Sequence, residues 1–254
     1  MFRRVARAIT PKKWHLTGRL QSAIVRRANG RVVTGMFAGM QYVEQSSGSV
    51  WLPKLLGTYE QELAPHLEPL LRQNFDVIVV AGAAEGYYAV GFALKSNAQK
   101  IVAFEPNPQA RGLLSELALK NGVAEQVIVK GICDLSGLKA VLDASSKSLV
   151  FVDIEGGEAL LLDPLMIPQL QKSTIVVEVH EMAIHGVGQL LRDRFRGTHN
   201  VVEQPTVQRT AEDYPLERDG MWRQLTDGAV EQLLSERRGG EMSWLILTPT
   251  TTRA

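Results

Sequence analysis

Five short apolar runs divide the middle of the chain at regular intervals. They are rich in β-branched residues and lie at 76–81, 101–104, 127–129, 149–152 and 175–179. Four of the five lack the polar alternation of a half-exposed strand, and continuous apolar strands are typical of a parallel sheet with helices on both faces. Helical stretches between the runs provide the crossovers that parallel strands require. The pattern therefore predicts a doubly wound α/β fold.

The clearest predicted helix follows the second apolar run, at about 108–121. Asn107 is suited to the N-cap, and Pro108 to the first helical position. One apolar stripe follows, made of Ala110, Leu113, Leu114, Leu117 and Ala118. Asn121 and Gly122 then end the helix.

The two ends of the chain carry weaker patterns. Near the start, we expect two short strands around a Gly-containing turn at 32–46, and leucine spacing predicts a helix at 59–72. Past residue 180 the expected elements are a helix at 186–196, a strand at 200–203, a helix at 227–238 and a strand at 242–247. The connection at 204–225 has no periodicity, and such long loops in compact domains are usually functional or disordered.

The composition is that of a globular protein. The chain has 254 residues, of which 45% are hydrophobic and 22% are charged, and this length suits one α/β domain. No stretch approaches the ~18 apolar residues that span a bilayer, and the start lacks the apolar core of a secretory signal. The only cysteine is Cys133, so an internal disulfide is excluded. We therefore expect a cytoplasmic enzyme.

The charge is unevenly distributed. Residues 1–43 contain nine Arg or Lys and no acid before Glu44, whereas the rest of the chain has 19 basic and 27 acidic side chains. We expect residues 1–50 to form a basic N-terminal extension that packs on the acidic domain at 51–254. Peripheral contact of this extension with an anionic membrane is the alternative, and specific nucleic-acid binding is not expected.

The turn after the first apolar run is made of small residues. Gly82 permits a tight turn, Ala83 and Ala84 let a ligand approach the backbone, and Gly86 lets the next helix pack closely. A dinucleotide fingerprint would place glycines at 84 and 87, where this chain has Ala84 and Tyr87, so a pyrophosphate site is disfavoured. Taken alone, the turn is equally compatible with an ordinary strand-to-helix connection.

Carboxylates at the next two strand ends suggest a nucleoside site. Glu105 lies 19 residues after Gly86 and precedes Pro106. A carboxylate at this position can accept hydrogen bonds from both ribose hydroxyls of an adenosine. After the third strand, Asp134 is placed to accept from the adenine amino group, with Ile132 against the ring. Asp134 is equally well suited to cap the following helix.

Several motifs, in order and spacing, resemble those of FkbM-like methyltransferases. They are 56–60 (LGTYE), 85–88 (EGYY), 104–108 (FEPNP), 152–158 (VDIEGGE) and 178–180 (EVH), and the likeness covers about residues 50–205. The resemblance implies a Rossmann-like, mostly parallel seven-stranded domain that uses S-adenosyl-L-methionine (SAM). It also implies methyl transfer to a hydroxyl of a saccharide, a lipid-linked saccharide or a natural product.

The cofactor residues expected from this reading lie between the first and fourth strands. They are Gly82, Ala83, Ala84, Glu85, Gly86, Glu105, Pro106, Ile132, Asp134 and Asp153. The chain departs from the family at Val80, where an acid usually helps to hold the methionine ammonium group. Glu85 and Asp153 are expected to lie near enough to replace that acid.

Methylation of a hydroxyl requires positioning and a proton acceptor. Candidates at the fourth and fifth strand tips are Asp153, Glu155, Glu158, Glu178, His180 and Glu181. A strand's period of two places Glu178 and His180 on one side, and His180 is the preferred base because its ordinary pKa lies near neutrality. A hydrogen-bonded structural histidine is the alternative. Asp153, Glu178 and His180 could also hold Mg²⁺ or Mn²⁺.

Two other functions compete with this interpretation. Val80 suggests a degenerate methyltransferase fold that serves as a non-catalytic binding or scaffold protein. The βαβ pattern with Glu105 suggests a nicotinamide-dependent oxidoreductase, which the missing glycines oppose. The connection at 204–225 and the basic extension are expected to shape the site of a small-molecule or saccharide acceptor.

Overall fold

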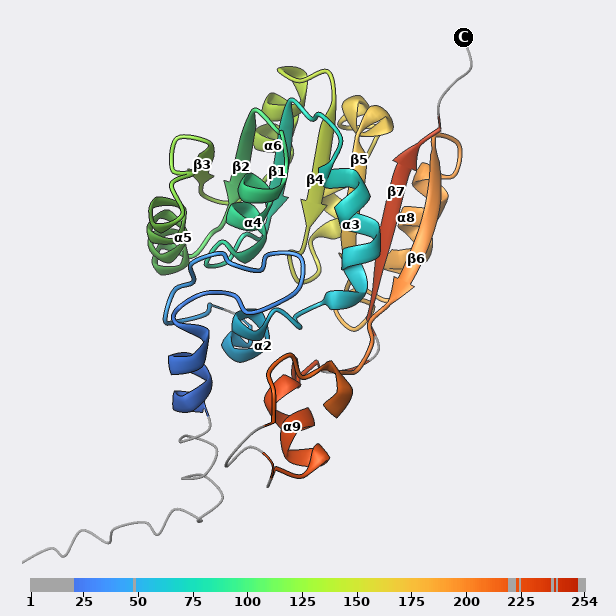
Figure 1. The fold of residues 1–254 in the computed structure, drawn as a ribbon. Helices are drawn as coiled ribbons and strands as arrows, with labels where there is room; N and C mark the ends of the chain where they lie inside the picture. Colours follow the sequence, from blue (N-terminus) through green and yellow to red (C-terminus); the bar gives the residue numbers. More distant parts are fainter. Residues whose placement is uncertain are drawn as a thin grey trace, which may run out of the picture.

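A seven-stranded sheet forms the centre of the protein in the computed structural model (Figure 1), which describes residues 21–47, 49–218, 223, 225–238, 240 and 242–250. Its strands are β1 (Val77–Ala81), β2 (Lys100–Phe104), β3 (Val127–Lys130), β4 (Ser148–Val152), β5 (Thr174–Val179), β6 (His199–Pro205) and β7 (Ser243–Pro249). Their order in the sheet is β3-β2-β1-β4-β5-β7-β6, and β7 runs antiparallel to both of its neighbours. The predicted Rossmann-like, mostly parallel fold is confirmed.

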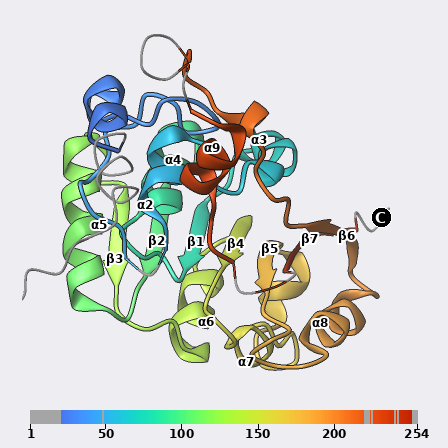
Figure 2. The same ribbon diagram turned by 90° about the horizontal axis from the view of Figure 1, so that it is seen from below.

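Helices cover both faces of this sheet (Figures 1 and 2). The α-helices are α2 (Trp51–Leu56), α3 (Ala64–Leu71), α4 (Tyr87–Lys95), α5 (Pro108–Lys120), α6 (Leu135–Asp143), α7 (Glu158–Leu161), α8 (Val187–Phe195) and α9 (Asp227–Leu234). Short 3-10 helices are η1 (Gln61–Leu63), η2 (Pro168–Lys172) and η3 (Ala211–Asp213). The helices α3, α4 and α5 lie on one face, and α6, α7 and α8 on the other.

The strands are buried on both faces, as their continuous apolar pattern predicted. On β1, Ile78 and Val80 belong to the hydrophobic cluster under α4 and α5, whereas Val77 and Val79 belong to the cluster under α6 and α8. The helix α5 begins as expected, since the Asn107 side chain accepts a hydrogen bond of 2.9 Å from the backbone N–H of Gln109.

The predicted pair of strands at 32–46 is wrong. In this part of the chain the structure has one isolated bridge, between Arg31 and Gln41. The N–H groups of Val33 and Thr34 instead donate to the last carbonyls of α2, at Leu55 and Leu56. The turn that follows places Phe37 in the core, against Tyr87 and Phe92. Hydrogen bonds across the turn, such as that from the Val32 N–H to the Met40 carbonyl at 2.9 Å, are therefore present without regular strands.

The predicted helix at 227–238 is too long, because α9 ends at Leu234. Ser235 is already extended, and Arg237 has a positive φ of 55°. No apolar residue after Leu234 continues the buried stripe, and the charged side chains of Glu236 and Arg238 instead form ion pairs below the sheet. Pairing of these charges with partners of opposite sign outweighs helix propensity here.

The segment before α2 packs into the same core as the sheet. Ile24, Phe37 and Tyr42 are buried members of the cluster that also contains Val80 and Phe92. Residues 1–20, which hold most of the basic side chains of the extension, lie outside the described residues. Within the part of the chain that is described, no helix has the length and apolar character needed to cross a bilayer.

Candidate functional site

Two adjoining cavities open where the parallel strands end, at the edge of the sheet that Figure 2 views from below. Their volumes are about 590 Å³ and about 620 Å³, and Gly82, Pro106 and Ile154 line both. Cavities of about 300–1,000 Å³ are typical of small-molecule and cofactor sites. The first is also lined by the predicted cofactor residues Ala83, Ala84, Glu105 and Asp153, and the second by Ile132 and Asp134. Glu85 and Gly86 line neither.

The turn at Gly82 fits tightly between two neighbouring strand ends. Gly82 has a φ of +83°, and a Cβ atom built there would lie 1.6 Å from the carbonyl oxygen of Asp153. The N–H groups of Gly82 and Ala83 both donate to the Phe104 carbonyl, at 3.0 and 2.9 Å. Glycine is therefore required at this position, both for its backbone conformation and for the space beside β4.

Glu105 is held rigidly at the end of β2. The backbone N–H of Ala84 donates to its Oε2 at 2.8 Å, and that of Asn107 donates to its Oε1 at 2.7 Å. The Arg111 guanidinium donates to the carbonyls of Glu105 and Pro106, each at 2.8 Å. Since an ionised carboxylate has about four acceptor positions, each oxygen can accept a further hydrogen bond from the cavity. This geometry suits a vicinal diol such as a ribose.

The second cavity continues along β2 and β3. Its wall is mostly apolar, with Phe104 and Leu135, and Ile132 is 71% exposed beside them. Asp134 caps α6, since its Oδ1 accepts from the Gly137 N–H at 2.6 Å. Hydrogen bonds from that N–H and from the Ser136 hydroxyl lower the pKa of Asp134. The capping role foreseen for Asp134 is thus present, and its expected contact with adenine stays a prediction.

Glu85 is a buried structural carboxylate. It accepts from the Lys54 ammonium and the Tyr42 hydroxyl, both at 2.6 Å, and from the Ser47 N–H at 2.9 Å. Burial alone would raise the pKa of Glu85, but the Lys54 charge and these hydrogen bonds outweigh it and lower the pKa. The sequence did not single out Lys54. Its pairing with Glu85 ties α2 to the first turn of the cofactor site.

Val80 lies in the core, 1% exposed, and presents no polar group to the cavity. Glu85 and Asp153 were expected to replace the acid that is missing at position 80. Because Glu85 is bound to Lys54, Asp153 is the one of the two that faces the first cavity.

The tips of β4 and β5 bring Asp153, Glu178 and His180 together, as expected. Nε2 of His180 lies 3.7 Å from Oδ1 of Asp153 and 3.5 Å from Oε2 of Glu178. Glu155 also contributes, with its Oε2 3.5 Å from the same nitrogen. The other ring nitrogen, Nδ1, lies 2.7 Å from Oε1 of Glu158, which is fully buried at the start of α7.

The excess of negative charge changes the acid–base properties of this cluster. Burial alone would lower the pKa of His180, but the hydrogen bond to Glu158 and the charge of Glu178 outweigh it, so the pKa is raised. Burial, followed by the charges of Glu178 and Glu60, raises the pKa of Asp153 well above its ordinary value. The cluster therefore binds protons more tightly than isolated side chains do.

Arg238 neutralises a second group of carboxylates that the sequence reading did not assign. Its guanidinium pairs with Glu178, with Glu60 at 2.8 Å and with Glu236 at 2.9 Å. Glu60 also accepts from the Tyr88 hydroxyl. Burial and the charge of Glu178 raise the pKa of Glu60 to about 7, against the opposing effect of Arg238. The motif at 56–60 could have pointed to Glu60, whereas Arg238 lay in a predicted helix.

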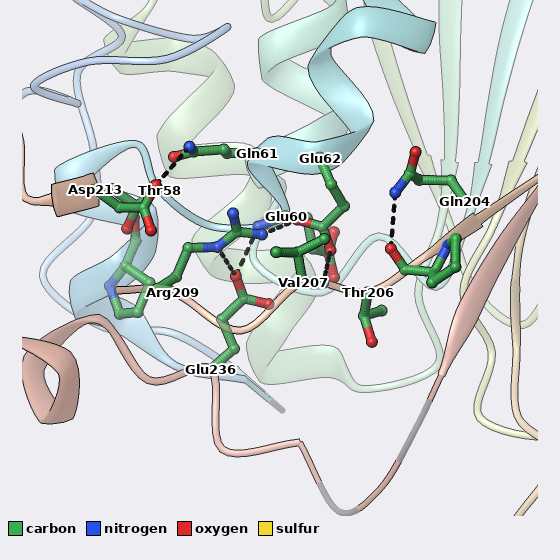
Figure 3. Close-up of polar contacts among 12 residues, drawn as sticks. Thr58, Glu60, Gln61, Glu62, Gln204, Thr206, Val207, Arg209, Asp213 and Glu236 are labelled. Atoms are coloured by element: carbon green, nitrogen blue, oxygen red, sulfur yellow. Dashed lines mark hydrogen bonds and ion pairs between the residues drawn. The ribbon is translucent and has the colours of Figure 1, made fainter. Parts of the chain in front are cut away.

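The connection at 204–225 is anchored by a buried ion pair (Figure 3). Arg209 lies between the carboxylates of Glu62 and Glu236, and all three side chains are at most 6% exposed. Gln61 adds a hydrogen bond of 3.0 Å to Asp213. Residues 219–222 lie outside the described residues, so the expectation that this connection shapes an acceptor site stays a prediction.

No protein-family model matches the sequence, and no curated protein matches it. Several solved structures have a similar fold. An rRNA methylase from Streptococcus thermophilus has a TM-score of 0.49 and 11% identity over 76% of this chain and 99% of its own. A precorrin-6y C5,15-methyltransferase from Geobacter metallireducens has a TM-score of 0.48 and 15% identity over 74% of this chain and 87% of its own.

M. jannaschii TYW2, solved in complex with AdoMet, has a TM-score of 0.46 and 14% identity over 73% of this chain and 72% of its own. The first two are named as a methylase and a methyltransferase, and the third was solved with AdoMet; at such identities the likeness concerns the fold alone. The function of this chain is therefore argued from its own site.

Proposed function

We propose that the protein is a SAM-dependent methyltransferase of the FkbM-like type. The observation that carries the proposal is the Glu105 carboxylate, which two backbone N–H groups hold at the edge of a nucleoside-sized cavity. Gly82 lines the same cavity, and its lack of a side chain lets the ends of β1 and β4 meet at the cavity wall. Asp153 faces the same space and offers negative charge to the ammonium or sulfonium group.

The acceptor that we propose is a hydroxyl of a saccharide, a lipid-linked saccharide or a natural product. The acceptor oxygen forms a bond to the methyl carbon as the carbon–sulfur bond breaks, and the sulfonium becomes a neutral thioether. The acceptor proton must leave during this step. With Nε2 of His180 free, that nitrogen takes the proton. Asp153 and His180 could instead hold a divalent cation, which would supply Lewis acidity toward the acceptor hydroxyl.

Titration calorimetry with SAM tests the cofactor. We expect micromolar binding by the full chain, and weaker binding by Glu105→Ala. A purified chain that releases no heat with SAM, and that carries no nucleoside in the cleft beside Glu105, contradicts the proposal.

A non-catalytic binding or scaffold protein is the second candidate, and buried Val80 is the observation that favours it. That proposal predicts no SAM binding by the native chain. If Val80→Asp alone binds SAM, the fold has lost its cofactor through this position. Comparable micromolar binding by both chains supports the enzyme.

A further inference from the structure

We propose that Asp153, Glu155 and His180 bind one divalent cation, Mg²⁺ or Mn²⁺, at the tips of β4 and β5. The role of this cation in activating an acceptor hydroxyl rests on the proposed function, whereas its binding does not.

The three side chains converge on one point. Each offers one ligand atom, and these atoms all lie within 4.8 Å of one another. His180 Nε2 is 3.7 Å from Asp153 Oδ1 and 3.5 Å from Glu155 Oε2. Ligands of a small divalent cation lie at about 2.0–2.2 Å from it, so neighbouring ligands are about 3 Å apart. Small rotations of the side chains are enough to bring these atoms to that spacing.

Two buried atoms at this point have no hydrogen-bond partner among the described residues. They are His180 Nε2, on a side chain that is 6% exposed, and Asp153 Oδ1. Buried polar atoms are almost always paired, and a bound ion is one recognised reason for an exception. Both atoms are of the kind that bind Mn²⁺, and each faces the other across the space in which the cation would lie.

Glu158 supports the histidine as metal sites usually require. It is fully buried, and its Oε1 lies 2.7 Å from Nδ1 of His180. A carboxylate on one ring nitrogen keeps the proton there, orients the ring and leaves the other nitrogen with a free lone pair. Without a cation or a proton, that lone pair would face three carboxylates, from Asp153, Glu155 and Glu178. The charge balance therefore favours a positive occupant.

Arg238 does not supply that charge. It pairs with Glu60, Glu178 and Glu236. Among the described residues, no lysine or arginine forms an ion pair with Asp153 or Glu155. Glu155 is 80% exposed and lines the first cavity, so the remaining coordination positions are open to water and to an acceptor hydroxyl. A cation bound here would lower the pKa of such a hydroxyl.

Mn²⁺ binding to the full chain, after treatment with EDTA and its removal, tests the proposal. Electron paramagnetic resonance counts free Mn²⁺ during the titration, and we expect one bound ion per chain. Asp153→Asn and His180→Gln should each weaken binding about a hundredfold or more, and Glu158→Gln by about 10- to 100-fold, the range for outer ligands. The exposed Glu125→Gln is the matched control and should bind like the native chain. Circular dichroism shows whether each variant is folded.

A native chain that binds no Mn²⁺, or folded Asp153→Asn and His180→Gln chains that bind as the native chain does, overturns the cation site. Calorimetry with SAM in the presence of EDTA separates this failure from that of the proposed function. SAM binding without Mn²⁺ binding removes the cation and keeps the methyltransferase. Mn²⁺ binding without SAM binding supports the cation site and removes the methyltransferase.

Discussion

Oε1 of Glu158 lies 2.7 Å from Nδ1 of His180, and this contact leaves Nε2 to face the carboxylates of Asp153, Glu155 and Glu178. Glu158 starts α7 and His180 follows β5, so the pair joins two segments of chain at the bottom of the site. The contact also raises the pKa of His180 against the opposing effect of burial. The acid–base behaviour of the site should therefore depend on a residue that does not line the cavity.

Glu158→Gln should move the acidic limb of the pH profile of kcat/KM for methyl transfer to lower pH. Protonated His180 can neither accept a proton nor bind a cation, so activity falls as pH drops through its pKa. Because Glu158 raises that pKa, its replacement lowers the pKa and moves the limb in the same direction.

The control for this shift is Glu125→Gln, which changes an exposed carboxylate elsewhere. Its profile should coincide with that of the native chain. A Glu158→Gln profile that keeps its acidic limb unchanged would show that His180 does not control activity.

Glu105→Ala should weaken SAM binding by about 10- to 100-fold. The change removes hydrogen bonds between ribose hydroxyls and a charged acceptor, and such a bond contributes about 1.5–3 kcal/mol. The backbone N–H groups of Ala84 and Asn107 also lose their partner. Calorimetry measures the dissociation constant, and equal affinity of the variant and the native chain counts against the proposed ribose contact.

Gly82→Ala and Gly112→Ala should change thermal stability in opposite directions. At Gly82 a Cβ would lie 1.6 Å from a carbonyl oxygen and φ is +83°, so the variant should melt at a lower temperature. At Gly112 a Cβ meets nothing within 4 Å, and alanine in a helix is favoured by about 1 kcal/mol. Scanning calorimetry compares the two, and a native-like melting temperature for Gly82→Ala refutes the packing argument.

The Asp153 carboxyl should stabilise the metal-free protein at low pH and lose this contribution as pH rises above about 4. The pKa of Asp153 is raised above the unfolded value of about 3.9, so the folded state holds the proton more tightly. The contribution of Asp153 to stability is complete below about pH 4 and is lost as pH rises through the pKa of Asp153 in the folded protein. The raised pKa of His180 acts in the same direction, from about 6.5 upward.

Melting temperatures measured in EDTA from about pH 4 upward test whether stability falls as pH rises. Asp153→Asn should show a smaller fall, because its side chain does not ionise. A fall of the same size in the variant would assign the effect to other groups.

Arg209→Met should lower the free energy of unfolding by about 3–5 kcal/mol, since it removes the cation that lies between two buried carboxylates, of which one keeps Arg238 as a partner. These are Glu62 and Glu236, which hold the connection after β6 against η1 and α9 (Figure 3). Denaturant unfolding measures the loss. The double variant with Glu62→Gln should recover part of the lost stability. If the two changes in the free energy of unfolding are fully additive, Arg209 and Glu62 do not interact.

The sequence alone determined the elements whose signals are local. Continuous β-branched runs predict strands buried on both faces, and all five form the parallel part of the sheet. The capping residue Asn107 and the stripe after it predict α5, because caps and helical periodicity depend on neighbours in the chain. Glu105 could be placed at a strand tip for the same reason, and strand tips of a parallel sheet meet at one edge.

Only the tertiary structure decided the contacts between distant segments. Val32 pairs with Met40 across a turn, but Val33 and Thr34 pair with the end of α2 instead of extending a hairpin. Lys54 with Glu85, and Arg238 with Glu60 and Glu178, join residues 31 to 178 positions apart. The sequence does not show whether a charged side chain is solvated or pairs with a buried partner. The partner is fixed only when the chain has folded and the cost of desolvation selects which charges meet.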